Sequence, residues 1–177
     1  MWTEATERRW QQEAELVMTG MMEWRLQHTR ASLKEIEDVL DERWAKMRAR
    51  MVQDLALKSA ATRITEASEA ERPTCPPCGG SLETRGEQER TLTTTHNQSI
   101  RLVRSYAICP ASGTGHFPLD EELQLLPGPF TPSLIESIVR LATWRPFVPV
   151  TKAIAFFYHV SVSEPTARRK TETAGAA

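Results

Sequence analysis

The chain has 177 residues, of which 40% are hydrophobic and 25% charged, a balance typical of a globular protein with one or two small domains. The longest strongly apolar run, AIAFFYHV, is far shorter than the ~20 residues of a membrane-spanning helix, and the N-terminus MWTEATERRW lacks a secretory pattern. Three cysteines are too few for a disulfide framework, so we expect a cytoplasmic protein. The net charge of −1 argues neither for nor against a nucleic-acid partner.

Residues 1–72 have the pattern of a helical lead segment. Ser32 and Glu35 form a capping box, in which each side chain accepts a hydrogen bond from a backbone N–H at the start of a helix. An apolar stripe of helical period follows and continues to about Ala61, through Ile36, Leu40, Trp44, Met47, Met51 and Leu55. An earlier helix, roughly Glu4 to Gln27, carries Trp10, Leu16, Val17, Met21 and Trp24. We expect these helices to pack as a hairpin or to pair with a second copy as a homodimer.

Residues 62–74, TRITEASEAERPT, lose the apolar pattern and predict a linker, with a domain boundary near residue 72. The sequence then changes to the period of strands, and Arg90–His96 with Ser99–Ile108 predict a β-hairpin joined at Asn97 and Gln98. Cysteine-bearing turns flank this hairpin. The order turn, hairpin, turn is typical of a zinc ribbon, in which a metal ion replaces the core that so short a sheet cannot build, so we expect a zinc-ribbon-like domain over residues 73–125.

The candidate metal ligands are Cys75, Cys78, Cys109 and His116. CPPCGG supplies two thiols on a turn that glycines allow to bend, and CPASGTGH supplies a third thiol, with Ser112 at the position where a fourth cysteine would stand. Because a neutral hydroxyl is a poor zinc ligand, the imidazole of His116 is the local substitute. Two alternatives stay open: a degraded site that folds without metal, and a redox-active Cys-x-x-Cys pair, although the βαβ context of such pairs is absent.

Residues 126–177 predict a helical domain. One helix begins after Thr131 with Pro132 at its first position, a more apolar helix follows Pro146, and a third is capped by Ser163. An apolar helix, a short turn and a capped basic helix form the pattern of a helix-turn-helix. The last helix would present its DNA-binding side chains to a duplex: Thr166, Arg168, Arg169 and Lys170.

Basic residues favour the C-terminal part as the surface for a polyanion. Residues 140–177 hold six basic and two acidic residues. Arg90, Arg101 and Arg104 lie on the predicted strands, which have little acid nearby, and would add a second contact with DNA. Since Arg101 and Arg104 are three residues apart, they should point to opposite faces of the sheet.

Several motifs together carry a resemblance to a known family. They are CPPCGG, Arg90, Thr93, Arg104, Tyr106, Cys109, the run Phe117-Pro118-Leu119-Asp120, Leu123 and Leu125, followed by the segment from Thr131 to Gly175. From about Ser32 to Gly175, and most specifically from Cys75 to Leu125, the chain resembles the N-terminal region of ISKra-type bacterial insertion-sequence transposases. The resemblance implies a helical lead segment, a zinc ribbon with two Cys-x-x-Cys pairs and a helix-turn-helix, ahead of a catalytic domain with acidic metal-binding residues.

The sequence thus predicts an α+β fold, mostly α, with an N-terminal helical hairpin, a small zinc-ribbon-like β-hairpin and a C-terminal helix-turn-helix. The chain ends about where the catalytic half of such a transposase would begin, and Asp120, Glu121 and Glu122 have no partner carboxylates downstream, so we do not expect an enzyme. We expect sequence-specific binding of double-stranded DNA at the ends of a mobile element, and a nucleoid location when bound. The alternative is a docking or scaffold subunit derived from a transposase.

Overall fold

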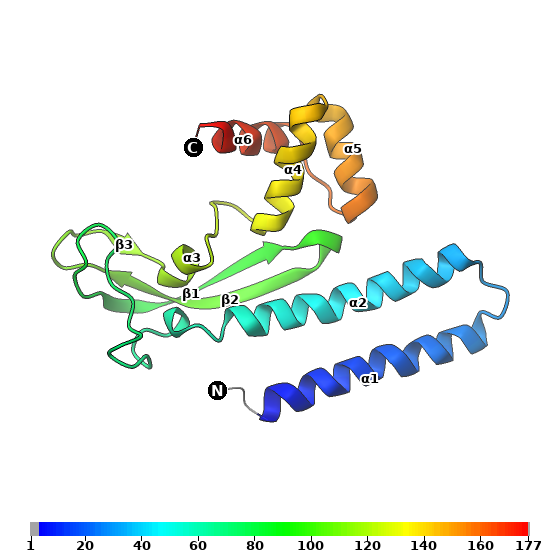
Figure 1. The fold of residues 1–177 in the computed structure, drawn as a ribbon, viewed down its shortest axis with the longest axis horizontal. Coiled ribbons are helices and arrows are strands. Elements are labelled where there is room, and N and C mark those ends of the chain that lie inside the picture. Colours follow the sequence, from blue (N-terminus) through cyan, green and yellow to red (C-terminus); the bar gives the residue numbers. More distant parts are fainter. Residues whose placement is uncertain (1–3, 177) are drawn as a thin grey trace. The chain divides into compact units, whose positions relative to one another are not determined.

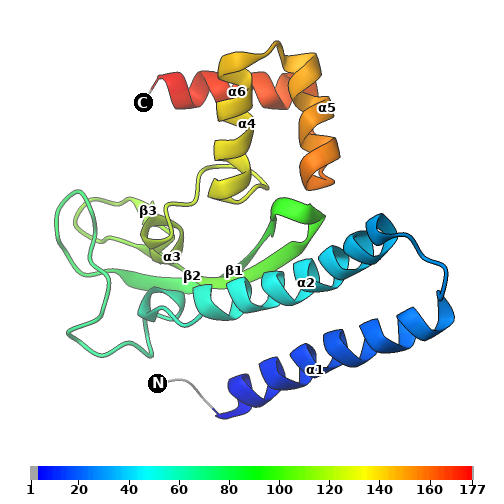
Figure 2. The same cartoon turned by 45° about the vertical axis from the view of Figure 1, so that its right-hand side comes forward.

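The computed structural model describes residues 4–176, and these form two compact units divided after Asp54. The fold is mixed α+β and mostly helical, as predicted, with a single three-stranded sheet among the described residues (Figures 1 and 2). No helix in the described part of the chain has the length and apolar character needed to cross a membrane.

The first unit is a helical hairpin of α1 (Glu4–Gln27) and α2 (Leu33–Ala56). The predicted capping box is confirmed: the backbone N–H of Ser32 donates to Glu35 Oε2 over 2.7 Å, and the N–H of Glu35 donates to Ser32 Oγ over 3.3 Å. The second helix ends at Ala56, earlier than the predicted Ala61. Its continuation is replaced by a 3-10 turn, Ala60–Thr62, because Ser59 Oγ accepts the N–H of Ala61 and offers the backbone another conformation.

The hairpin has almost no core of its own. In the described parts of α1 and α2 the buried residues are small, namely Thr6, Ala45 and Ala49. Polar contacts join the helices at one end, where Asp54 accepts hydrogen bonds from Arg9 (2.7 Å) and from the Trp10 indole (2.8 Å). A groove of about 590 Å³ runs between the helices and is lined by both apolar and charged side chains, including Leu16, Val17, Met47, Arg43 and Arg50.

The second unit is built on an antiparallel sheet in the order β1 (Glu83–Thr93), β2 (Ser99–Ile108) and β3 (Gly115–His116). The first strand begins seven residues before the predicted Arg90. Its early part is exposed on both faces and therefore shows no apolar alternation, and a bulge at Arg85 and Gly86, with Gly86 at a φ of 118°, interrupts the register.

The predicted linker is part of the second unit, and the predicted boundary near residue 72 falls inside it. Ile64 is buried in a cluster with Cys75, Leu82, Ala107 and Cys109. The backbone around it is held by Ser105, whose Oγ donates to the carbonyl of Thr62 over 3.1 Å. The single large apolar residue of this segment, Ile64, and the hydrogen bonds with Ser105 thus hold its start against the sheet.

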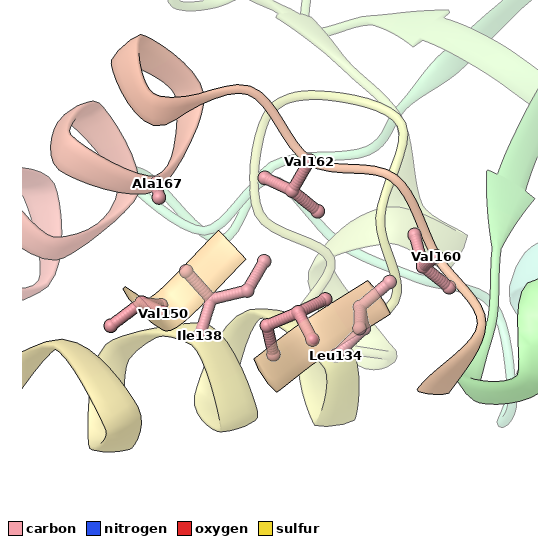
Figure 3. Close-up of a cluster of buried hydrophobic side chains, with 7 residues drawn as sticks. Leu134, Ile138, Val150, Val160, Val162 and Ala167 are labelled. Carbon is pink, nitrogen blue, oxygen red and sulfur yellow. The ribbon is translucent and has the colours of Figure 1, made fainter. Parts of the chain in front are cut away.

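The C-terminal part of this unit contains α3 (Pro118–Glu122), α4 (Pro132–Trp144), α5 (Phe147–Tyr158) and α6 (Glu164–Gly175). The helices α4 and α5 are antiparallel, and α6 lies across them (Figures 1 and 2). Figure 3 shows the core that they share: Leu134 and Ile138 from α4, Val150 from α5, Val160 and Val162 from the connecting segment, and Ala167 from α6. Burial of these apolar side chains is the main force that fixes α6 on the helical pair.

The helical part is not separated from the sheet by a flexible linker at residue 125. The end of β1 forms a parallel bridge with the segment before α4, since the N–H of Thr93 donates to the carbonyl of Pro129 (2.7 Å) and the N–H of Thr131 donates to that of Thr93 (3.0 Å). The two predicted C-terminal domains are therefore parts of one compact unit.

Candidate metal centre

The first cysteine turn is a tight loop closed by two backbone hydrogen bonds. The N–H of Cys75 donates to the carbonyl of Gly80 over 2.9 Å, and the N–H of Gly79 donates to the carbonyl of Cys75 over 2.7 Å. Gly79 has a φ of 68°, which a residue with a side chain rarely adopts. The turn ends in a bridge between Thr74 and Ser81.

The second cysteine turn repeats the first residue for residue. The N–H of Cys109 donates to the carbonyl of Thr114 over 3.0 Å, and the N–H of Gly113, again at a φ of 68°, donates to the carbonyl of Cys109 over 2.8 Å. It also ends in a strand pair, Ile108 with Gly115. The two turns therefore have the same hydrogen bonds at the same offsets from their first cysteine, an equivalence that their sequences only partly show.

The three thiols gather between these turns. Their sulfur atoms all lie within 4.8 Å of one another, and the Sγ atoms of Cys78 and Cys109 are 3.5 Å apart. A zinc–sulfur bond of about 2.3 Å gives a tetrahedron with edges of about 3.8 Å, so the observed spacing fits one ion bound by all three sulfurs. Cys75 and Cys109 are buried, and Cys78 is exposed.

Ser112 occupies the fourth corner of this arrangement. It holds the position in the second turn that Cys78 holds in the first, and its Oγ lies 3.7 Å from Cys75 Sγ. The Oγ also shares a hydrogen bond of 2.5 Å with the hydroxyl of Thr114. The geometry thus places a serine hydroxyl where the repeated turn would otherwise present a fourth sulfur.

His116 lies next to the thiols but contacts only one of them. Its Nε2 is 3.5 Å from Cys75 Sγ and 2.9 Å from Thr114 Oγ1. Among the described residues, the group of ligand atoms that all lie within 4.8 Å of one another consists of the three sulfurs and does not include His116. On the other side of the ring, Nδ1 is 2.9 Å from a carboxylate oxygen of Glu121. Histidines that bind metal usually have such a carboxylate partner, so Glu121 fixes the ring with Nε2 toward the cluster.

Sequence reasoning missed Glu121 and Thr114 as neighbours of the site. In the sequence, Glu121 stands out only as one of three consecutive acidic residues, Asp120 to Glu122. The available signal was its place in the first turn of a helix that starts two residues after His116, because a first-turn side chain can reach back toward the preceding strand.

Hydrogen bonds around the cluster favour one thiolate. The pKa of Cys109 is lowered to about 6, first by a hydrogen bond from the Ser112 hydroxyl and then by one from the Ser112 backbone N–H. The backbone N–H of Gly80 acts to lower the pKa of Cys78, but hydrogen bonds with the Cys109 and Cys75 thiols outweigh it and leave that pKa raised. A cluster in which one thiol, that of Cys109, ionises easily and two other sulfurs lie close by suits a thiophilic divalent cation.

The redox alternative finds no support in the local fold. A thioredoxin-like pair lies at the start of a helix, whereas Cys75 and Cys78 lie on a turn between extended segments, and Cys78 Sγ also lies 3.5 Å from Cys109 Sγ. The residues present fit a metal bound by three sulfurs better than a disulfide-exchange pair.

Two of the arginines predicted to contact DNA are internal. Arg104, whose side chain is 7% exposed, donates to Asp120 over 2.6 Å and 3.0 Å and lies 4.0 Å from the centre of the Phe117 ring. Arg90 donates to the same carboxylate over 2.7 Å and also to the carbonyls of Leu126 and Gly128. The expectation that these strands have little acid nearby is wrong, because the fold places the Asp120 carboxylate of α3 against both arginine side chains.

Arg101 lies on the opposite face of the sheet from Arg104, as its spacing predicted. It is exposed and forms an ion pair with Glu89 on β1. Of the three strand arginines predicted to contact DNA, Arg101 is therefore the one that faces solvent.

The four residues predicted to bind DNA on α6 have different environments. Arg168 and Arg169 are exposed; Arg168 lies 3.3 Å from Glu164 and 5.3 Å from the centre of the Phe147 ring. Thr166 is half-buried at the capped start of the helix, where Ser163 Oγ accepts its N–H. Lys170 instead donates to the carbonyl of Pro127, and burial lowers its pKa.

Comparison of the sequence with protein-family models and with curated proteins, and of the fold with solved structures, found no match.

Proposed function

We propose that this chain is a sequence-specific DNA-binding module of the transposase type, in which α5 and α6 form a helix-turn-helix. The observation that carries the proposal is the way α6 is presented. Its inner side is fixed by Ala167 in the shared core (Figure 3), while the side chains of Arg168 and Arg169 are exposed. A capped helix held across two antiparallel helices, with adjacent basic residues exposed, suits insertion into a major groove.

Within this proposal the arginines have different roles. Arg168 and Arg169 would contact phosphates or guanine edges, and Thr166 would lie near the first base contacts. Lys170 and Arg90 would position α6 by holding the segment 126–128 between them, since both donate to carbonyls of that segment.

Cys75, Cys78 and Cys109 would hold a zinc ion, with His116 or an oxygen at Ser112 in the fourth position. The ion would join the two cysteine turns and so stabilise the end of a sheet too small to be stable by its own core. This role is structural, and neither substrate nor reaction is assigned to the ion.

The test is selection of fragments from the host genome on the purified chain at two salt concentrations. We expect one repeated sequence to be enriched at low salt and lost at high salt, because contacts with phosphates release counterions. The double variant R168A/R169A should lower affinity and reduce the slope of log affinity against log salt by about 2.

The matched control is R140A/R145A, which removes the same charge from α4 and from the residue that caps its C-terminus, in the same helical part. If both double variants weaken binding equally, the effect is one of total charge and α6 is not the reading helix. If a folded chain enriches no sequence, the proposal is wrong.

The alternative function, a docking subunit, is favoured by a different observation. Trp144, Phe156 and Phe157 are 84%, 75% and 63% exposed, and the two phenylalanine rings pack edge to face with centres 5.1 Å apart. Large aromatic side chains of this kind are common at protein interfaces. Binding through them would change little with salt, which separates this function from DNA binding in the same experiment.

A further inference from the structure

One face of α2 carries an apolar stripe of exposed side chains. Leu33, Leu40, Trp44 and Leu55 are all exposed, Leu33 to 71% and Trp44 to 46%. At about 100° per residue these four positions lie within an arc of about 60° along the whole helix. The groove toward α1 is lined by a different side of the helix, with Val39, Arg43 and Arg50.

Charge is separated along the same helix. Residues 33–42 hold five acidic residues and one basic residue, a net charge of −4, whereas residues 43–56 hold four basic residues and one acidic residue, a net charge of +3. The change of sign falls beside Trp44, near the middle of α2. A helix with this pattern is complementary to a second copy of itself running in the opposite direction.

We propose that the chain forms a two-fold symmetric dimer in which α2 packs antiparallel on α2 of a second copy. An axis at Trp44 places this residue against its own counterpart and Leu33 against Leu55 of the second copy. It also brings Asp41 within one helical turn of Arg48 of the second copy. Both residues lie on the same side of the apolar stripe of α2. The four helices of two hairpins would then enclose the core that one hairpin lacks.

A second copy fits this surface better than an unrelated partner. In an antiparallel pair, the acidic half of each α2 would face the basic half of the other. A partner that is wholly acidic or wholly basic would be repelled by one half of the helix. The shorter apolar row on α1, formed by Met18, Met22 and Leu26, has no comparable separation of charge. The proposed dimer does not depend on DNA binding or on metal.

The experiment is a charge exchange followed by analytical ultracentrifugation of the full chain, whose mass is 20.0 kDa. The parent should sediment as a dimer. Asp41→Arg and Arg48→Asp should each weaken the dimer at least about tenfold, because each places like charges opposite one another at two symmetric positions. The double variant D41R/R48D should restore the parent affinity.

Lys46→Asp is the control, since Lys46 lines the groove toward α1 and makes an i,i+4 pair with Glu42. It should leave the dimer unchanged, and circular dichroism should show the same helix content in all four variants. A monomeric parent at micromolar concentration would overturn the proposal. So would a dimer that neither single exchange weakens, or one that the double exchange fails to restore.

Discussion

Ser112 is the residue on which the chemistry of the metal centre depends. It occupies the fourth corner formed by two turns with the same backbone, yet it offers a hydroxyl where three neighbours offer sulfur. The backbone is thus already shaped for a ligand that the side chain does not provide. Replacing the Ser112 hydroxyl with a thiol would add a ligand without a change in the backbone of the turn.

We therefore expect Ser112→Cys to raise metal affinity. Even an outer-shell partner changes affinity by about 10–100-fold, so a fourth thiolate should give at least about tenfold. Titration with Co²⁺ measures this, because charge-transfer absorption grows with each thiolate bound and the ligand-field bands show tetrahedral geometry.

Ser112→Ala is the matched control and should not tighten binding. If Ser112→Cys binds Co²⁺ no more tightly than the parent, the fourth corner is not a ligand position, and His116 is the better candidate for completing the site.

At the scale of elements, one carboxylate joins three parts of the second unit. Asp120 on α3 binds Arg90 on β1 and Arg104 on β2, and Arg90 extends the connection to the segment before α4. The adjacent Glu121 binds His116 beside the thiols. The short helix α3 therefore has one polar contact toward the metal centre and another toward the helical part.

We expect Asp120→Asn to destabilise the second unit by about 3 kcal/mol, because it leaves two largely buried guanidinium groups without their counterion. Urea unfolding followed by amide hydrogen exchange of β1 and β2 measures this effect apart from the N-terminal hairpin. Glu136→Gln, which breaks the exposed pair with Arg140, is the control and should change stability by about 0.5 kcal/mol or less. Equal effects of the two changes would contradict the structural role of Asp120.

Local signals in the sequence predicted the elements well. The capping box at Ser32, the proline at the start of α4, the Ser163 cap of α6 and the strand pattern of β2 correspond to helices and strands found at those places. These signals act over a few residues and depend little on distant parts of the chain. The Cys-x-x-Cys turn likewise predicted the approach of Cys75 and Cys78 to Cys109.

Contacts between distant residues were beyond such signals. Nothing near Arg90 or Arg104 in the sequence indicates that Asp120 lies beside them in the fold, so their ion pairs could not be predicted. Ile64 in a polar segment looked like part of a linker, because its burial depends on Leu82 and Ala107 far along the chain. The partner of His116 was missed for the same reason.

At the scale of the whole molecule, the two units should respond differently to loss of metal. Removal of the metal with a chelator should loosen the cysteine turns, residues 75–81 and 109–116, the second of which includes β3. Amide hydrogen exchange should increase in both turns, because the bound ion supplies stability that the small sheet lacks. Exchange in α1 and α2 should not change. Hydrogen–deuterium exchange with mass spectrometry, with and without Zn²⁺, measures both.

Cys75→Ser should reproduce the effect of the chelator in the presence of zinc. An exchange pattern that neither the chelator nor this variant alters would show that the turns fold without a metal ion, as the alternative of a degraded site predicts.

The equivalence of the two cysteine turns also has a consequence for the history of the gene. Because glycine and backbone hydrogen bonds define each turn, the second turn keeps its shape with serine at its fourth residue. Many serine codons become cysteine codons by a single nucleotide substitution. A fully sulfur-ligated centre is one such substitution away when one of these codons encodes Ser112.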